Sequence, residues 1–240
     1  MEKKVLLFSG GFDSMLQEWL IKPDVLLYVD MKTSYSEREI EALQLLPDSY
    51  KERLIIKELP LGEYERDNKY LPYRNLILGA IAMQYGQHVY FGFNNEDWAS
   101  DKDTIFLDKT TSLFKHLNER AVWDMGWDNF NFSFNAPFKK YSKTEMVREA
   151  LKAGMPVELI QQTRSCYDGE SKIGCGVCNV CVNKAIALLL NDIYSPELFD
   201  HPITLEQIET RIEDARTKET TCTKKHFFEL QKAAKKLRCL

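Results

Sequence analysis

The sequence predicts an α/β fold in which a parallel β-sheet is flanked by helices. Two observations predict it: short apolar runs alternate with helix-like segments through the first half of the chain, and the first run passes directly into a glycine turn and a helix. Such alternation is typical of parallel sheets, because their crossover connections place helices on both faces. A third observation, a compact cluster of cysteines and glycines after residue 165, indicates a different C-terminal part.

The individual elements follow from hydrophobic periodicity. We expect strands where short apolar runs are bounded by turn residues, at Val5–Phe8, at Val25–Val29, from Leu54 onward, at His88–Phe91 and at Asn131–Phe138. We expect helices where apolar residues recur with helical spacing, at Asp13–Ile21, Ser36–Leu46, Tyr73–Tyr85, Thr104–Asn118, Ser142–Ala153 and Val182–Leu190. Pro47 should stop the second helix, and Ser142 followed by Glu145 is a capping-box pattern. The last fifty residues are charged and helical in pattern.

Composition limits the classes of protein that remain. The chain has 240 residues, a net charge of −4 and 28% charged residues, so a basic nucleic-acid-binding surface is not expected overall. We see neither a signal peptide nor an apolar run long enough to span a membrane, and we therefore expect a cytoplasmic protein without a membrane partner. Six cysteines in a reducing compartment indicate metal binding or catalysis before disulfides.

The glycine turn after the first strand has the features of an anion site. Gly10 and Gly11 lack side chains, so backbone can approach a ligand closely. The following helix directs its free N–H groups and the positive end of its dipole at the turn, and Ser9 and Ser14 add hydroxyl donors. Asp13 would repel phosphate unless it holds Mg²⁺ or caps the helix. The simpler alternative is an ordinary turn with Asp13 as the helix cap.

Four cysteines have the spacing of a metal site. They form the pattern C-x8-C-x2-C-x2-C, at Cys166, Cys175, Cys178 and Cys181. Four thiolates leave no open coordination position, so we expect a structural zinc ion. An iron–sulfur cluster is the main alternative, because four cysteines also suit it. A second alternative is that these cysteines bind no metal.

The chain resembles the 7-cyano-7-deazaguanine synthase (QueC) family, within the PP-loop ATP pyrophosphatase superfamily. The resemblance runs from about residue 4 to residue 190, with five motifs in the family's order: Phe8-Ser9-Gly-Gly-x-Asp13-Ser14, Pro72-x-Arg74-Asn75, the Gly92 loop with Asp97 and Asp103, Ala136-Pro137 before Ser142-Lys143-Thr-Glu145, and Ser165-Cys166-Tyr167-Asp168-Gly169 through Cys181. It implies an adenine nucleotide α-hydrolase-like, Rossmann-like ATP-binding domain over residues 1–160 and a zinc-binding helical region over 161–240.

The resemblance also implies roles for particular residues. ATP would be bound by Phe8, Ser9, Gly10, Gly11, Phe12, Asp13 and Ser14. The catalytic residues would be Asp13, which suits Mg²⁺, with Ser14, Arg74 and Lys143. The substrate would be contacted by Asn75, Asp97 and Asp103. The alternatives are surface ion pairs for Arg74 and Lys143 and solvated turns for Asp97 and Asp103.

The implied reaction converts 7-carboxy-7-deazaguanine and ammonia to the nitrile, with ATP, through an adenylated carboxylate and an amide. The implied protein is a homodimeric ligase of queuosine biosynthesis that contacts no nucleic acid directly. Two departures concern the substrate side: Asp30-Met31-Lys32-Thr33-Ser34 stands where the family has Tyr-Gly-Gln-x-His, and Asn95 replaces a common Glu, although Glu96 follows. They leave open a relative that stops at the amide or acts on another carboxylate. We also weigh a tRNA-thiolating enzyme and a zinc-stabilised binding module against the synthase.

Overall fold

The computed structural model of the chain describes residues 2–97, 99–125, 131–166, 173–217 and 223–239, the side chains of residues 120–125 excepted. The chain divides into two compact units. The first comprises Met1–Ser9, Lys22–Phe93 and Asp97–Lys139, and the second comprises Gly10–Ile21, Asn94–Glu96 and Lys140–Leu240. Residues 161–240 thus fall in the second unit together with the helix that follows the glycine turn, and the expected domain boundary at residue 160 stays a prediction.

Within the described residues, a sheet of five parallel strands forms the centre of the first unit. In space the strands follow the order β3-β2-β1-β4-β5. They are β1 (Lys4–Leu7), β2 (Val25–Asp30), β3 (Leu54–Glu58), β4 (His88–Tyr90) and β5 (Ser133–Asn135). Val5 of the central strand is opposite Val25 on one side and Val89 on the other. The predicted parallel α/β fold is confirmed, and the strand order reverses direction next to β1, where ligands of such sheets bind.

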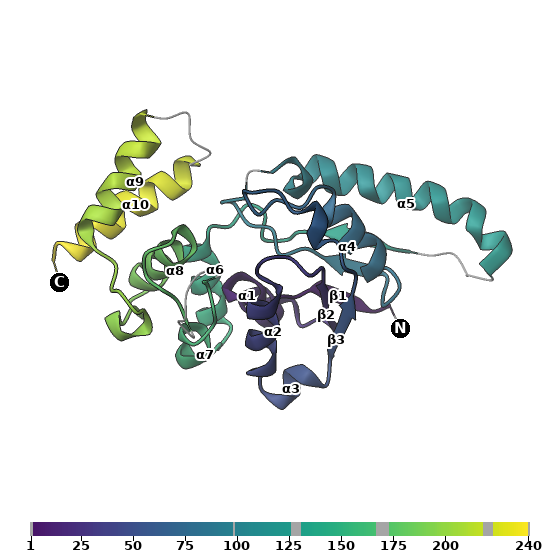
Figure 1. The fold of residues 1–240 in the computed structure, drawn as a ribbon, viewed down its shortest axis with the longest axis horizontal. Helices are drawn as coiled ribbons and strands as arrows, with labels where there is room; N and C mark the ends of the chain where they lie inside the picture. The colour runs from purple at the N-terminus through teal and green to yellow at the C-terminus, as the bar shows by residue number, and fades with distance from the viewer. Residues whose placement is uncertain (1, 98, 126–130, 167–172, 218–222, 240) are drawn as a thin grey trace. The chain divides into compact units, whose positions relative to one another are not determined.

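The helices of the first unit lie against this sheet. They are α2 (Ser36–Gln44), α3 (Asp48–Lys51), α4 (Arg74–Ala82) and α5 (Thr104–Met125), with 3-10 turns at Gly62–Tyr64 and Ser100–Lys102. Helix α4 contacts β1 and α5 contacts β5. Helix α5, the long teal helix of Figure 1, continues past the expected end at Asn118, because residues 119–125 contain no glycine or proline. No described helix combines the length and apolar character that a membrane span needs.

Aromatic side chains dominate the core of the first unit. The rings of Phe91 and Phe93 stack with centroids 4.8 Å apart, and Phe134 lies 6.1 Å from Phe91. A β-carbon built on Gly79 of α4 would lie 3.1 Å from the ring of Phe134, so the glycine lets the helix approach this strand. The remaining core residues are aliphatic or aromatic, and they include Val5, Leu27, Val29, Met31, Leu71, Ala82, Met83, Val89, Leu107 and Phe132.

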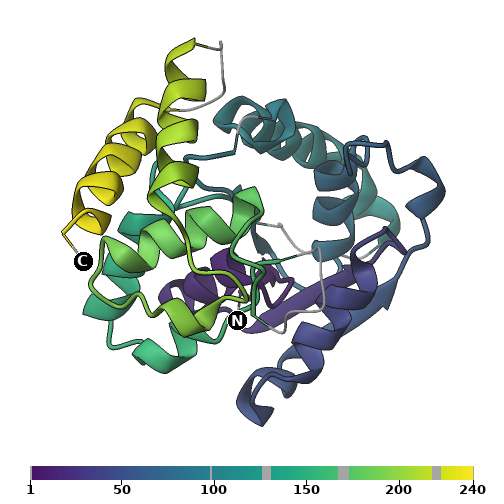
Figure 2. The ribbon, with the colours of Figure 1, turned by 60° about the vertical axis from the view of Figure 1, so that its left-hand side comes forward.

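The described part of the second unit is helical. Its helices are α1 (Phe12–Ile21), α6 (Lys143–Lys152), α7 (Val157–Gln161), α8 (Asn179–Leu189), α9 (Leu205–Thr217) and α10 (Lys224–Leu237), with a 3-10 turn at Pro196–Leu198. Helix α6 packs against α1 and α8, and α10 packs against α8 and α9 (Figure 2). The expected capping box is confirmed, because the Ser142 side chain accepts from the Glu145 N–H and the Glu145 side chain accepts from the Ser142 N–H. Helix α8 begins three residues before the expected Val182, directly after Cys178.

Candidate functional site

The backbone of the glycine turn is hydrogen-bonded to the segment around residue 164. Gly10 has a φ of 72°, which glycine adopts without steric cost. The Phe12 N–H donates to the Arg164 carbonyl at 3.0 Å, so this part of the turn is paired with a second piece of backbone. The Ser14 hydroxyl donates to the Gly11 carbonyl at 2.9 Å, and its proton is therefore used within the turn. The expected anion site depends on the backbone N–H groups at the start of α1.

Asp13 and Lys143 form an ion pair in the second unit. The Lys143 ammonium donates to Oδ2 of Asp13, and Nδ2 of Asn94 donates to the same oxygen at 3.2 Å. Lys143 is the first residue of α6 and only 8% exposed, and Asp13 lies in the first turn of α1. Two of the predicted catalytic residues thus meet although 130 positions separate them. The pair sets a cation suited to phosphate beside a carboxylate suited to a hard metal ion.

Glu96 extends this polar cluster toward α8. Its Oε1 accepts from the Lys143 backbone N–H at 3.4 Å, and its Oε2 accepts from Nδ2 of Asn183 at 2.8 Å. Arg211 in turn donates to the side-chain oxygen of Asn183 at 2.6 Å. The carboxylate of Glu96 is therefore held by partners on both sides, at the N-terminal end of the helix that carries Lys143.

Arg74 belongs to a separate cluster in the first unit. It is the first residue of α4 and donates from Nη1 to the Tyr35 hydroxyl at 2.7 Å. Burial raises the pKa of the neighbouring Glu39 carboxyl to about 7, whereas the hydrogen bond with Tyr28 and the charge of Arg74 act in the opposite direction. Below pH 7 this carboxyl is mostly protonated and neutralises the guanidinium less, which suits a residue expected to bind an anionic substrate group.

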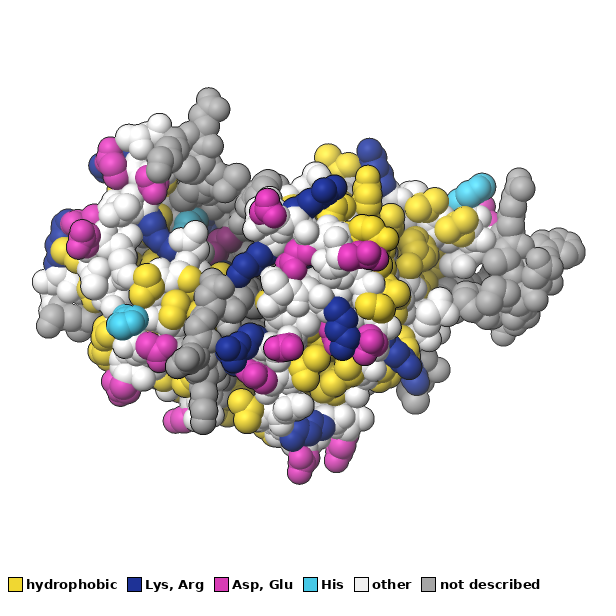
Figure 3. All heavy atoms as spheres, in the orientation of Figure 1, with side chains coloured by type: hydrophobic (Ala, Val, Ile, Leu, Met, Phe, Trp, Pro, Cys, Tyr) yellow, Lys and Arg dark blue, Asp and Glu magenta, His cyan; other side chains and the backbone are white. Residues whose placement is uncertain are grey.

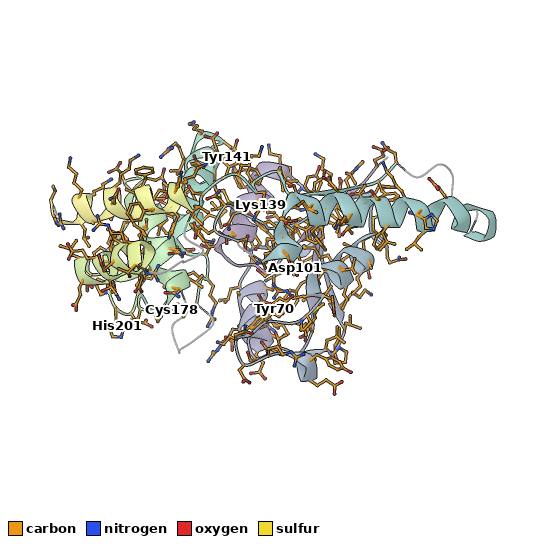
Figure 4. All side chains as sticks on the ribbon, turned by 90° about the horizontal axis from the view of Figure 1, so that it is seen from above. Tyr70, Asp101, Lys139, Tyr141, Cys178 and His201 are labelled. Atoms are coloured by element: carbon orange, nitrogen blue, oxygen red, sulfur yellow. The ribbon has the colours of Figure 1, made fainter. Side chains whose placement is uncertain are left out.

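The three residues predicted to contact the substrate also lie in the first unit. Nδ2 of Asn75 donates to Oδ2 of Asp101 at 2.8 Å (Asp101 is labelled in Figure 4). Asp97 accepts from the Lys102 ammonium at 2.6 Å. Oδ1 of Asp103 accepts at 2.7 Å from a backbone N–H in the first turn of α5, so this carboxylate caps the helix. The partners of all three lie in the loop before α5 or in the first turn of that helix. Their role in substrate binding stays a prediction.

The four cysteines of the predicted metal site come together. Their sulfur atoms all lie within 4.8 Å of one another. Cys166 and Cys178 have sulfurs 3.9 Å apart, as do Cys175 and Cys181. Tetrahedral zinc with Zn–S bonds of about 2.3 Å places sulfurs about 3.8 Å apart, so the set fits a single ion. An iron–sulfur cluster sets several irons between its thiolates and needs a wider arrangement.

Backbone geometry around the cysteines supports a metal knuckle. The N–H groups of Val177 and Cys178 donate to Cys175 Sγ at 3.4 and 3.3 Å, the arrangement of a tight turn around a cysteine ligand. A β-carbon on Gly176, which has a φ of +75°, would lie 1.6 Å from the His201 carbonyl oxygen, so only glycine fits there. Figure 4 labels Cys178 and His201. Of the expected motif Ser165 through Gly169, residues 167–169 lie outside the described part of the chain.

Lys184 links the cysteine helix to the segment that holds the glycine turn. It is fully buried on α8, three residues after Cys181, and donates to the carbonyls of Gln161 and Thr163. Its nitrogen also lies 5.6 Å from the centre of the Phe12 ring. Burial lowers the pKa of this amine to about 7. Two N–H donors are available in either protonation state, so the contact with the two carbonyls persists.

Sequence reasoning missed several members of these clusters. Asn94, Asp101 and Lys184 were not predicted, although each contacts a predicted residue. Arg211 was not predicted either, and it reaches Lys143 through Asn183 and Glu96. Asn94 carries the one usable signal, because it follows a strand and polar residues at the carboxyl ends of parallel strands often line sites. For Lys184 and Arg211, an amphipathic helix pattern gives no means to separate a solvated cation from a buried one.

A family model described as "Queuosine biosynthesis protein QueC" matches residues 49–191. This segment includes the predicted substrate loop, Lys143 and all four cysteines. The match therefore covers more than half of the chain.

Curated relatives extend over most of the chain. A 7-cyano-7-deazaguanine synthase of Marinobacter nauticus is 25% identical over 227 residues, which cover 82% of this chain and 96% of the relative. The protein of the same name from Campylobacter concisus is 28% identical and covers 75% and 91%. That from Archaeoglobus fulgidus is 26% identical and covers 82% and 90%.

Proposed function

The chain belongs to the QueC family, and from this premise we propose that it is an ATP-dependent carbon–nitrogen ligase that converts 7-carboxy-7-deazaguanine and ammonia to 7-cyano-7-deazaguanine. The observation that carries the proposal is the match to relatives that bear the synthase name and are covered over nine-tenths of their length. The related ligase that stops at the amide is not favoured, because these relatives share one name.

The chemistry explains why the reaction needs ATP twice. A carboxylate is a poor electrophile, so transfer of AMP to one of its oxygens first creates a good leaving group and releases pyrophosphate. Ammonia then attacks the carbonyl carbon, AMP departs with that oxygen, and an amide results. A second AMP transfer to the amide oxygen, followed by loss of AMP and two N–H protons, gives the nitrile. We expect AMP rather than ADP as the nucleotide product.

We propose that the second unit supplies the phosphate-binding groups. The backbone N–H groups of the Gly10 turn would bind the pyrophosphate portion of ATP, and Ser9 lies next to them in the sequence. Lys143 would offset charge that develops on the phosphates during AMP transfer. Asp13 offers a partly exposed carboxylate, the ligand type that Mg²⁺ prefers, and a magnesium ion held there would neutralise phosphate charge. Phe8, Phe12 and Ser14 would support the turn through backbone and packing contacts.

For the first unit we propose substrate recognition. The planar guanidinium of Arg74 can pair two oxygens of a carboxylate or phosphate. The side chains of Asn75, Asp97 and Asp103 would meet the N–H edge of a guanine-like base, which carboxylates and amide oxygens accept from. Departures from the family pattern at residues 30–34 fall at the end of β2 in this unit and would alter substrate contacts.

We propose zinc as the ion of the four-cysteine site, with a structural role. Sulfur distances that suit one tetrahedral ion and the absence of a fifth ligand among the described cysteines support this choice. An assay of metal content in the purified protein tests it: one zinc per chain is expected, and iron with a visible charge-transfer spectrum would overturn it.

A homodimer is our proposal for the assembled protein, which we place in the cytoplasm without direct contact to nucleic acid. Helix α5 supports the dimer, because Ile105, Leu113 and Leu117 are 59%, 45% and 53% exposed and recur on one side of it. Figure 3 shows yellow hydrophobic side chains exposed along this helix. Light scattering of the protein and of a Leu113→Glu variant tests this: a dimer that the variant disrupts is expected.

The function itself is tested by mixing purified protein with Mg-ATP, ammonium and 7-carboxy-7-deazaguanine and identifying the base by mass spectrometry. The nitrile is the expected product. An amide that accumulates without nitrile would assign a shortened reaction to this chain, and an unchanged base with folded, zinc-loaded protein would overturn the proposed substrate.

A further inference from the structure

Two helices beyond the family segment form what we name the C-terminal hairpin, α9 (Leu205–Thr217) and α10 (Lys224–Leu237). The family model matches residues 49–191 and therefore does not include these helices. Helix α9 (yellow-green in Figure 2) and helix α10 (yellow) pack against each other, and α10 also packs against α8. Glu229, Leu230 and Ala233 of α10 are buried, which shows that the hairpin is folded into the second unit.

Helix α10 completes the N-terminal cap of α6. The fully buried Ser142 hydroxyl accepts from the Glu145 N–H at 3.2 Å and donates its proton to Oε1 of Glu229 at 2.5 Å. Lys225 donates to Oε2 of Glu145 at 2.7 Å and to the Lys140 carbonyl at 2.8 Å. Because a hydroxyl has one proton, Ser142 can donate only one hydrogen bond, and its acceptor is Glu229 of the hairpin.

The start of α10 also holds the loop that carries Asn94 and Glu96. Thr223 donates from its hydroxyl to the side-chain oxygen of Asn95 at 2.6 Å. The same hydroxyl accepts from the His226 N–H at 3.2 Å and thereby caps α10. A single threonine therefore fixes both the first turn of α10 and the loop beside the Lys143 ion pair.

Helix α9 holds the other end of this loop indirectly. Arg211 donates to the side-chain oxygens of Asn183 and Asn179, both at 2.6 Å. Asn183 then donates to Glu96 at 2.8 Å, and Glu96 accepts from the Lys143 backbone N–H. The contacts of α9 and α10 thus both reach the start of α6, those of α10 at the cap and those of α9 through Asn183 and Glu96 at the Lys143 backbone N–H.

We propose that the C-terminal hairpin is a brace that positions Lys143, with Glu229 as its principal positioning residue. The inference rests on the proposed function, in which Lys143 contacts the ATP phosphates. Lys143 directly follows the capping serine, so the cap and Glu96 fix the backbone from which its ammonium reaches Asp13. The Glu229 carboxylate holds the cap through the serine proton, and its loss leaves a buried hydroxyl without that acceptor.

Three single variants test the brace in the full-length protein. Glu229→Ala removes the acceptor of the Ser142 proton, whereas Glu229→Gln retains an oxygen that can accept it. Glu209→Ala is the matched control, because Glu209 pairs with Arg238 on the exposed face of the same hairpin. Amide hydrogen exchange of residues 142–147 in ligand-free protein reports on the cap, and calorimetric ATP affinity together with kcat and KM for ATP reports on Lys143.

We expect Glu229→Ala to accelerate exchange at residues 142–147 and to lower kcat/KM for ATP about tenfold, the effect of one hydrogen bond to a charged group. Glu229→Gln should restore most of both, and Glu209→Ala should change neither. Unchanged exchange and ATP kinetics in Glu229→Ala would overturn the brace. A lower melting temperature with the ATP parameters of wild type would also overturn it, because the hairpin would then act only as scaffold.

Failure of the brace and failure of the proposed function can be told apart. Exchange and ATP affinity are measured without the deazapurine, so they judge the brace even if wild-type protein forms no nitrile. If wild type forms the nitrile while Glu229→Ala matches it in exchange and in ATP affinity, the function stands and the brace falls. If wild type forms no nitrile but the variant shows faster exchange and weaker ATP binding, the brace stands and the substrate assignment falls.

Discussion

Within the second unit, the cysteine site and the lysine cluster are built in opposite ways. The four sulfurs come from sixteen consecutive residues, and a tight glycine turn brings them together. Lys143 instead meets Asp13 from 130 positions away, and its helix cap is completed by Glu229 from 87 positions beyond Ser142. The first site is a local sequence motif, and the second exists only when several helices are packed.

The largest effect should come from the local site. Cys178→Ser removes one of four thiolates, and because structural zinc binding contributes on the order of 10 kcal/mol to folding, we expect loss of zinc and of cooperative unfolding. Cys239→Ser is the matched control, since Cys239 is exposed and outside the cluster. Metal analysis and thermal melting check it; a zinc content equal to that of wild type would show that the cysteines do not share an ion.

The next effect should fall on activity rather than on folding. Lys143→Met keeps the length of the side chain but removes its charge, so we expect a loss of about 100-fold in kcat/KM for ATP, the usual effect of deleting one group that stabilises transition-state charge. Lys140→Met removes an exposed cation three residues away and should behave as wild type. Steady-state release of pyrophosphate measures both, and a fully active Lys143→Met enzyme would contradict the assignment.

Lys184 tests whether the two regions are coupled. Lys184→Met leaves the carbonyls of Gln161 and Thr163 without their donor, and we expect a loss of about 2–3 kcal/mol in the free energy of unfolding in urea. Since the adjoining Arg164 carbonyl pairs with Phe12 in the glycine turn, KM for ATP should rise as well. Lys184→Arg retains the donors as a partial rescue. A stability loss without any change in KM would show that the regions are independent.

The smallest effect should come from Glu39, which tests a long-range cluster in the first unit. Burial raises the pKa of its carboxyl from 4.5 in the unfolded chain to about 7 in the folded one. The folded protein then binds more protons between these values, so Glu39 makes the free energy of unfolding fall as pH rises from 4.5 through 7. Glu39→Gln removes this dependence.

The free energy of unfolding of Glu39→Gln, relative to that of wild type, should rise by about 1–2 kcal/mol from pH 5 to pH 8. This is less than the free energy that corresponds to the full pKa shift, because the side chain keeps some exposure. Urea unfolding at the two pH values measures it. Glu37→Gln, an exposed change on the same helix, should show no such gain. A pH profile identical in Glu39→Gln and wild type would place the carboxyl in a solvated setting.

Features that depend on residues close together in the sequence could be predicted, whereas contacts between residues far apart in the sequence could not. All five strands were anticipated within a few residues, because short apolar runs bounded by turns are typical of buried strands. Helix ends were less certain: α5 ran past Asn118 and α4 stopped at Ala82 before the expected Tyr85. The capping box at Ser142 was predicted correctly from two residues, yet the same two residues carry no sign that Glu229 completes it.

By itself the sequence determined the parallel α/β class, the glycine turn before α1 and the cluster of four cysteines. Each depends on neighbours in the chain, through periodicity, backbone freedom or ligand spacing. Tertiary structure alone decided that Lys143 pairs with Asp13, that Lys184 is buried between two carbonyls, and that a C-terminal hairpin holds the cap of α6. Burial and long-range pairing depend on which helix faces meet, and no local pattern of residues encodes that choice.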